Sequence, residues 1–154
     1  MSLRSVMKAV IQRVKKTTLS VDGKTVSTIP FGLTVFLGVG VGDKESQGEY
    51  LAKKIANLRI FEDADGKMNF SVKDVGGEVL LVSQFTLYGD TAKGNRPSFS
   101  LAERPERAEE LYEYTAKRLR EWGVIVKQGV FGADMKIEQY NDGPVTILMD
   151  AGGK

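Results

Sequence analysis

The stretch EVLLVSQFTLY, residues 78–88, is the part of the sequence on which the fold depends most. Its Val, Leu and aromatic residues are typical of a β-strand, and we predict one strand over Glu78–Tyr88. The nearly continuous apolar run FGLTVFLGV, at Phe31–Val39, suits a strand that is covered on both faces. We therefore expect this second strand to be central in the sheet.

Further strands are predicted on both sides of these two runs. Asp22-Gly23 is the dipeptide most typical of a tight hairpin turn, so the segments that flank it are expected to pair. Glycines separate the short strands expected near the C-terminus. The predicted strands are Met7–Lys15, Thr17–Val21, Lys24–Ile29, Arg59–Glu62, Val124–Val130, Met135–Tyr140 and Val145–Asp150.

Two segments have the apolar periodicity of amphipathic helices. Asp43 is expected to cap the first helix, which extends to about Leu58. The second is predicted to begin at Pro105, a residue favoured in the first helical turn, and to end at Gly123. Because several consecutive strands are joined too tightly for parallel crossovers, we predict an α+β fold with a mainly antiparallel, barrel-like sheet. Two helices cannot cover both faces of a large sheet, so a dimer is expected.

The composition fits one globular domain. Of the 154 residues, 42% are hydrophobic and 27% are charged. Residues 7–154 are predicted to form a single domain, behind a leader or cloning remnant at residues 1–6. No apolar stretch approaches the roughly 18 uncharged residues that a membrane helix needs, and MSLRSV lacks the apolar centre of a secretory signal. We therefore expect a cytoplasmic protein with no membrane partner.

The sequence contains no Cys and no His. The chain therefore cannot form a Cys/His zinc site, a Cys nucleophile, a disulfide or a relay with imidazole as the general base. The groups that remain for chemistry are Ser and Thr hydroxyls, carboxylates, Lys, Tyr, oriented backbone amides and groups of the substrate.

The charged residues limit the choice of partners. The aspartates lie in separate turns without the spacing of a calcium or magnesium loop, so we predict neither a metal nor a cofactor. The net charge of +2 predicts that any RNA contact is limited in area. Charge runs such as the one that contains Arg13, Lys15 and Lys16 are expected to be solvated.

Three hydrogen-bonding side chains interrupt the apolar strand at Ser83, Gln84 and Thr86. In a strand, Gln84 and Thr86 would share one face, with Ser83 and Phe85 on the other. These polar groups either satisfy neighbouring backbone groups at the end of the strand or form the edge of a pocket. In the second case, backbone N–H groups near Phe85 and Thr86 could stabilise developing oxyanion charge.

Three other segments each allow two interpretations. Asn141–Pro144 is typical of a turn between strands, but a cis Gly-Pro bond would hold its carbonyls rigidly as a wall. The loop that contains Lys93 and Arg96 is either solvated or in contact with phosphates. Phe131 and Met135 are either core residues or parts of an adaptable apolar pocket.

Several motifs in the same order resemble the D-aminoacyl-tRNA deacylase family, or D-tyrosyl-tRNA deacylases. They are MKAVIQRV from Met7, SQFTLY from Ser83, KGNRPSF from Lys93 and NDGPVT from Asn141, and the resemblance covers essentially the whole chain from Met7. It implies a homodimeric hydrolase that cleaves the ester bond of D-aminoacyl-tRNA in chiral proofreading during translation. It also implies that the partner is the acceptor end of aminoacylated tRNA.

The resemblance assigns roles to individual residues. Gly143-Pro144 would be a cis element inserted into the partner subunit's site, where its carbonyls exclude an L side chain. Thr86 would lie near the reacting carbonyl. The remaining expected positions are Ser83, Gln84 and Phe85 in the catalytic pocket, Phe131 and Met135 near the adenine, Ala102 among the substrate-binding residues, and Lys93 and Arg96 as tRNA contacts.

The missing imidazole and thiol also shape the expected mechanism. Without an evident base, Thr86 is expected to position the substrate rather than attack it. Backbone amides would stabilise the oxyanion, and the 2′-hydroxyl of the terminal ribose would help to activate water. Exclusion of a side chain cannot reject glycine, so some hydrolysis of glycyl-tRNA is expected. The alternatives are hydrolysis of another ester or amide, a non-catalytic RNA-binding module and a structural dimer.

Overall fold

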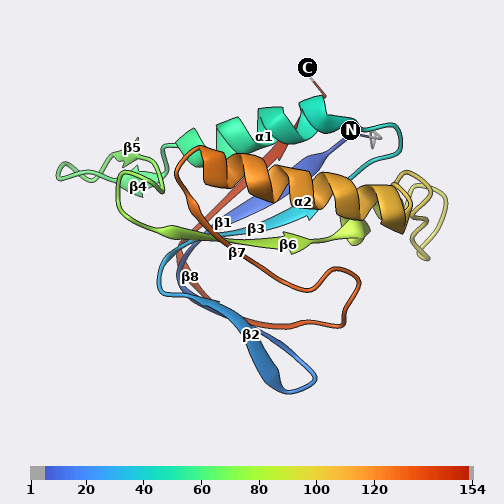
Figure 1. Cartoon of the computed structure of the whole chain (residues 1–154), viewed down its shortest axis with the longest axis horizontal. Coiled ribbons are helices and arrows are strands. Elements are labelled where there is room, and N and C mark those ends of the chain that lie inside the picture. Colours follow the sequence, from blue (N-terminus) through green and yellow to red (C-terminus); the bar gives the residue numbers. More distant parts are fainter. Residues whose placement is uncertain (1–5, 153–154) are drawn as a thin grey trace.

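A mixed six-stranded sheet and two helices form the protein in a computed structural model, which describes residues 6–152 (Figure 1). Five strands follow one another in the order β2, β1, β3, β6, β7, and β8 also pairs with β1. A separate two-stranded sheet contains β4 and β5. The elements are β1 (Lys8–Val21), β2 (Lys24–Ile29), β3 (Gly32–Gly38), α1 (Glu45–Asn57), β4 (Phe61–Glu62), β5 (Met68–Phe70), β6 (Glu78–Ser83), the 3-10 helix η1 (Phe85–Tyr88), α2 (Pro105–Glu121), β7 (Ile125–Gln128) and β8 (Lys136–Asp150).

Antiparallel pairs surround β1, and parallel pairs lie beyond β3. The strand β1 is antiparallel to β2, β3 and β8, whereas β3 with β6 and β6 with β7 are parallel pairs. Each parallel pair is joined by a connection that contains a helix, which gives the length that a parallel crossover needs. The α+β class with two helices is confirmed, and β3 lies in the interior of the sheet as predicted.

The two ends of the strand order, β2 and β7, approach each other. The Ser27 hydroxyl donates to the carbonyl oxygen of Gln128 at 2.6 Å, and the Lys127 ammonium donates to the carbonyl oxygen of Thr28 at 2.8 Å. Hydrogen bonds from side chains to backbone carbonyls connect these two strands, rather than a ladder of backbone hydrogen bonds. The sheet is therefore nearly closed, which agrees with the predicted barrel-like core.

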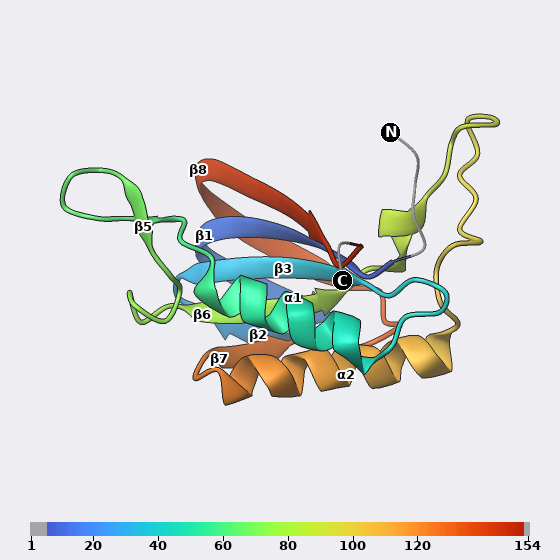
Figure 2. The same ribbon diagram turned by 90° about the horizontal axis from the view of Figure 1, so that it is seen from above.

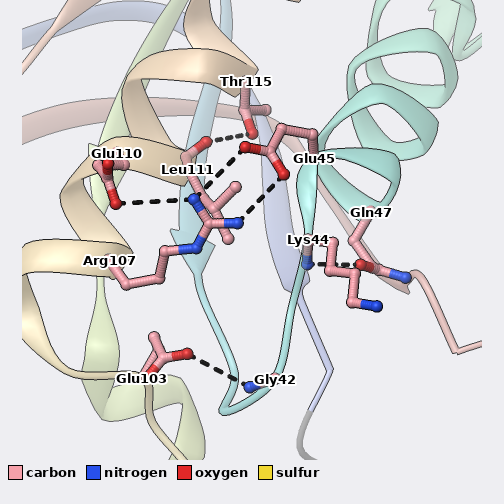
Figure 3. Close-up of polar contacts among 9 residues, drawn as sticks. All are labelled: Gly42, Lys44, Glu45, Gln47, Glu103, Arg107, Glu110, Leu111 and Thr115. Carbon is pink, nitrogen blue, oxygen red and sulfur yellow. Dashed lines mark hydrogen bonds and ion pairs between the residues drawn. The ribbon is translucent and has the colours of Figure 1, made fainter.

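The two helices pack side by side across one face of the sheet (Figures 1 and 2). Leu51 and Ile55 of α1 and Leu111 and Leu119 of α2 are fully buried, as their periodicity predicted. Exposed ion pairs also join the helices, and Figure 3 shows one of them, between Arg107 and Glu45 at 3.1 Å. Because exposed ion pairs contribute little, burial of the apolar faces holds the helices in place.

The prediction that Asp43 caps α1 was wrong. Lys44 precedes the helix, and its N–H donates to the side-chain oxygen of Gln47 at 2.7 Å (Figure 3). The Asp43 carboxylate instead accepts the N–H of Gly40 at 2.7 Å, and burial raises the pKa of this carboxyl group. Asp43 therefore stabilises the loop that leads to α1.

The strand β1 is longer than predicted. It joins the predicted strands Met7–Lys15 and Thr17–Val21, because β8 pairs with both parts. The hairpin to β2 is confirmed, and Asp22 and Gly23 have the positive φ angles, 51° and 76°, that its turn requires.

Two short segments lie in the second sheet and at the N-terminus. The strand β5 was not predicted, since it has only three residues. Of the predicted leader at residues 1–6, the first five lie outside the described residues, and Val6 packs against the core.

Candidate active site

The strand β6 ends at Ser83, although we had predicted that it extends to Tyr88. The N–H of Gln84 donates to the carbonyl oxygen of Leu37 at 2.9 Å, and the chain then turns into η1. Fully buried Tyr88 anchors the end of η1, because its hydroxyl donates to the carbonyl oxygen of Val6 at 2.6 Å. The expected alternation of side chains from Ser83 to Thr86 across two faces is therefore absent.

Gly38 lets β3 approach η1 closely. A Cβ at this position would lie 2.7 Å from the ring of Tyr88 and 3.1 Å from the carbonyl oxygen of Gln84. Real Cβ atoms essentially never come as close as the first of these contacts, and the hydrogen bond of Tyr88 restrains its ring. The absence of a side chain at Gly38 thus positions η1.

We expect a Gly38→Ala substitution to lower the free energy of unfolding by about 1–3 kcal/mol, since it overpacks a buried contact. Urea denaturation measures this change. Gly94→Ala is the matched control, because a Cβ there meets nothing within 4 Å, and it should change stability by less than about 0.5 kcal/mol. Equal stability of the two variants would show that Gly38 does not position η1.

A cavity of about 670 Å³ lies beside η1. It brings together six of the predicted site residues from three separate segments of the chain. These are Ser83, Gln84, Phe85, Ala102, Phe131 and Met135. Segments that are far apart in the sequence thus contribute polar and apolar walls to one cavity, as the pocket interpretation required.

Phe85 forms part of this wall although 57% of its surface is exposed. Its ring packs edge-to-face against Phe99, with centroids 5.2 Å apart, and Phe99 lines the cavity as well. On the other side of the cavity, Phe131 packs against Tyr112 at 6.0 Å. Burial raises the pKa of Tyr112 to about 12, so this phenol stays protonated near neutral pH.

Thr86 is exposed and does not itself line the cavity. Its hydroxyl oxygen accepts a short hydrogen bond from the side-chain amide of Gln84, which does line the cavity. The backbone N–H groups of Phe85 and Thr86 lie at the start of η1, and neither has a hydrogen-bond acceptor within residues 6–152. Both N–H groups thus lack an acceptor among the described residues, and Phe85 itself lines the cavity.

The block from Asn141 to Pro144 lies within one strand, so a turn between two strands was the wrong interpretation. The strand β8 pairs with β1 on both sides of the block and does not reverse its direction. Residues 142–145 stand opposite Arg13 alone, which makes this block a bulge. At its centre Gly143 has a φ of 128°, and the Gly143-Pro144 peptide bond is cis.

Arg13 supports this bulge, whereas we had expected it to be solvated. Only 6% of the residue is exposed. Its guanidinium donates to the carbonyl oxygen of Asp142 at 3.1 Å and to that of Ile60 at 2.7 Å. The alternation that buries Ala9 and Ile11 on one face of β1 also includes Arg13, and this signal could have revealed the burial.

The other predicted site residues lie outside the cavity. Gly143 and Pro144 do not line it within this chain, and Lys93 and Arg96 are exposed in the loop after η1. Within residues 6–152, no three His, Cys, Asp or Glu side chains come together closely enough to hold a metal ion. No helix in the same range is long and apolar enough to cross a membrane.

The α+β fold with its nearly closed sheet and the cavity beside η1 together indicate the class of this protein. The Ser83 hydroxyl and the Gln84 amide side chain meet apolar residues in this cavity, which suits a hydrolase that binds an acyl group. The sequence matches the family described as D-Tyr-tRNA(Tyr) deacylase over residues 10–150. The chain therefore belongs to this family of hydrolases, which confirms the family predicted from the motifs.

Individual relatives agree with this assignment. A D-aminoacyl-tRNA deacylase of Koribacter versatilis is 59% identical over 94% of this chain and 97% of its own length. One of Fervidobacterium nodosum is 54% identical over the same shares of the two chains.

Solved structures share the fold. The structure of a c-Myc DNA unwinding element binding protein superposes with a TM-score of 0.86 and 43% identity, over 92% of this chain and 97% of that one. A second structure, titled "Structural Analysis of a probable eukaryotic D-amino acid tRNA deacylase", has a TM-score of 0.82 over 94% of this chain and 99% of that one. Since its identity is 17%, it shows the shared fold alone.

Proposed function

We propose that the protein hydrolyses the ester bond of D-aminoacyl-tRNA and releases the D-amino acid and tRNA. The observation that carries this proposal is the cavity beside η1, where Ser83, Gln84 and Phe85 meet Phe131 and Met135. The polar side of the cavity suits the amino group and the ester, and the apolar side suits the base of the terminal adenosine. A tRNA substrate also fits the expected cytoplasmic location.

The proposed catalytic groups are backbone amides rather than a side-chain nucleophile. The available N–H groups of Phe85 and Thr86 would stabilise the negative charge that develops on the carbonyl oxygen of the ester when water attacks. Gln84 donates to the Thr86 hydroxyl and fixes its orientation, and no imidazole or thiol exists to remove its proton. Thr86 therefore orients the substrate, and the 2′-hydroxyl of the terminal ribose helps to activate water.

Rejection of L-amino acids is assigned to the bulge of a second subunit. In our proposal, the carbonyl oxygens at Gly143-Pro144 enter the partner subunit's cavity and exclude an L side chain. The placement of this bulge outside the cavity of its own chain is compatible with action in trans. The outer face of β8 also exposes Tyr140 by 73% and Leu148 by 72%, which supports a homodimer that covers this face.

Lys93 and Arg96 are proposed to contact tRNA outside the cavity. Both are exposed in the loop after η1, and neither forms an ion pair with a described residue. Two exposed cations can bind phosphates without reading the sequence. The contribution of these two residues to tRNA binding should weaken as the salt concentration rises.

The decisive test compares D-tyrosyl-tRNA with L-tyrosyl-tRNA under one set of conditions. We expect rapid hydrolysis of the D form and little hydrolysis of the L form, measured as loss of labelled amino acid from tRNA. Equal rates for both forms would refute the proposed function. Glycyl-tRNA should be hydrolysed to some extent, because steric exclusion has no side chain to act on.

The same assay separates the alternative functions. A hydrolase of small esters would cleave a D-amino acid ester without RNA as fast as the tRNA substrate. A nucleic-acid-binding module would bind RNA or DNA with steep salt dependence and without turnover. The net charge of +2 gives no broad basic surface for this second alternative.

A further inference from the structure

Arg104 is the one cation among the described residues that line the cavity. It lies directly before α2, and its carbonyl oxygen accepts the N–H of Ala108 at 2.9 Å, which fixes the start of its side chain. The side chain is exposed, and its guanidinium has no hydrogen bond or ion pair with residues 6–152. A charged group that can form paired hydrogen bonds is thus available at the cavity wall.

The two carboxylates of the cavity wall already have other partners. Glu103 accepts the N–H of Gly42 at 3.3 Å (Figure 3) and the backbone N–H of Arg104 at 2.9 Å. Asp134 forms an ion pair with Lys136 at 3.0 Å. Neither carboxylate forms an ion pair with the Arg104 guanidinium. Because Lys136 compensates the charge of Asp134, Glu103 is the carboxylate of the cavity wall that would repel an anionic substrate.

We propose that Arg104 binds the phosphate on the 5′ side of the terminal adenosine of tRNA. This inference rests on the proposed function, because it requires that the terminal aminoacyl-adenosine occupies the cavity. The RNA strand then continues from the ribose into a phosphate, which brings a negative charge to a cavity whose wall also contains Glu103. Arg104 is the lining residue that can compensate this charge, and its planar guanidinium can contact two phosphate oxygens at once.

The test compares D-tyrosyl-adenosine with D-tyrosyl-adenosine 5′-monophosphate, which differ only in the phosphate. For the wild type we expect kcat/KM to be about three- to tenfold higher with the phosphate, through a lower KM. Arg104→Gln should abolish this preference and leave kcat/KM for the nucleoside substrate unchanged. Arg104→Lys should restore part of the preference, since a point charge replaces the planar fork.

A matched control removes one positive charge elsewhere. Lys53 of α1 is exposed and does not line the cavity, so Lys53→Gln should keep the full preference for the phosphate. If Arg104→Gln also keeps it, the inference is overturned while the proposed function stands. If the wild type cleaves neither compound nor D-tyrosyl-tRNA, both fail together.

A carboxylate on the amino acid is a second anion that Arg104 could bind. The same variants are therefore assayed with D-aspartyl and D-asparaginyl esters of adenosine. We expect Arg104→Gln to leave their ratio of kcat/KM unchanged. Loss of a preference for D-aspartate, without loss of the phosphate effect, would overturn the assignment to phosphate.

Discussion

D-Aminoacyl-tRNA with a 2′-deoxy terminal adenosine is expected to be hydrolysed about 10²- to 10⁴-fold more slowly than the normal substrate, the range for loss of one proton-transfer group. The chain contains no His or Cys, and the described structure shows no base beside the Thr86 hydroxyl, which accepts a hydrogen bond from Gln84. A hydroxyl of the substrate then becomes the group that can help to activate water. Single-turnover rates at saturating enzyme isolate this step from tRNA binding.

A Thr86→Ala variant provides the complementary measurement. If Thr86 only orients the substrate, this variant keeps measurable activity, and its residual activity still depends on the 2′-hydroxyl. Complete loss of activity in Thr86→Ala, together with equal rates of the wild type for the normal and 2′-deoxy substrates, would instead indicate that Thr86 is the nucleophile. Circular dichroism of the variant excludes unfolding as the cause.

Local sequence signals predicted the elements that depend on neighbouring residues. The turn at Asp22-Gly23 requires two positive φ angles, and the start of α2 at Pro105 uses a residue whose φ suits the first turn. The apolar periodicity of both helices corresponds to their buried faces. These features are encoded within a few residues of each other, so a single sequence reveals them.

The errors lie where distant segments meet. Glu78–Tyr88 has the composition of one strand, but the close approach at Gly38 and the anchor of Tyr88 at Val6 shape its last part into η1. Asn141–Pro144 has the composition of a turn, but pairing with β1 on both sides keeps it in β8. Neither contact can be inferred from local propensity, because tertiary pairing overrides it.

The site was predicted partly from chemistry and partly from the family motifs. The polar interruption of an apolar strand allowed either a satisfied strand end or a pocket edge at Ser83 and Gln84, and both residues line the cavity. The residues around Phe131 and Met135 favoured core packing, and the resemblance placed both in the site. The burial of Arg13 was missed, because a charge next to other charges is usually solvated.

A Gly143→Ala variant should raise the ratio of L- to D-aminoacyl-tRNA hydrolysis by about 10- to 100-fold, the discrimination that a steric contact supplies. Gly143 has a φ of 128°, which L side chains rarely adopt. A Cβ would lie 3.0 Å from the backbone nitrogen of Val145 and 3.3 Å from the Arg13 guanidinium. The bulge must therefore shift, and the carbonyl oxygens proposed to exclude the L side chain would move with it.

The bulge has little freedom to absorb such a change without moving its carbonyls. Arg13 connects the carbonyl oxygen of Asp142 to that of Ile60, and its burial prevents the guanidinium from moving aside into solvent. Gly66→Ala is the matched control, because Gly66 has a φ of 76° and no atom within 4 Å of an added Cβ. Gly66→Ala introduces the backbone strain without a steric contact, so it should keep the wild-type ratio of L- to D-aminoacyl-tRNA hydrolysis. A folded, dimeric Gly143→Ala protein that also keeps that ratio would show that the bulge does not select the D form.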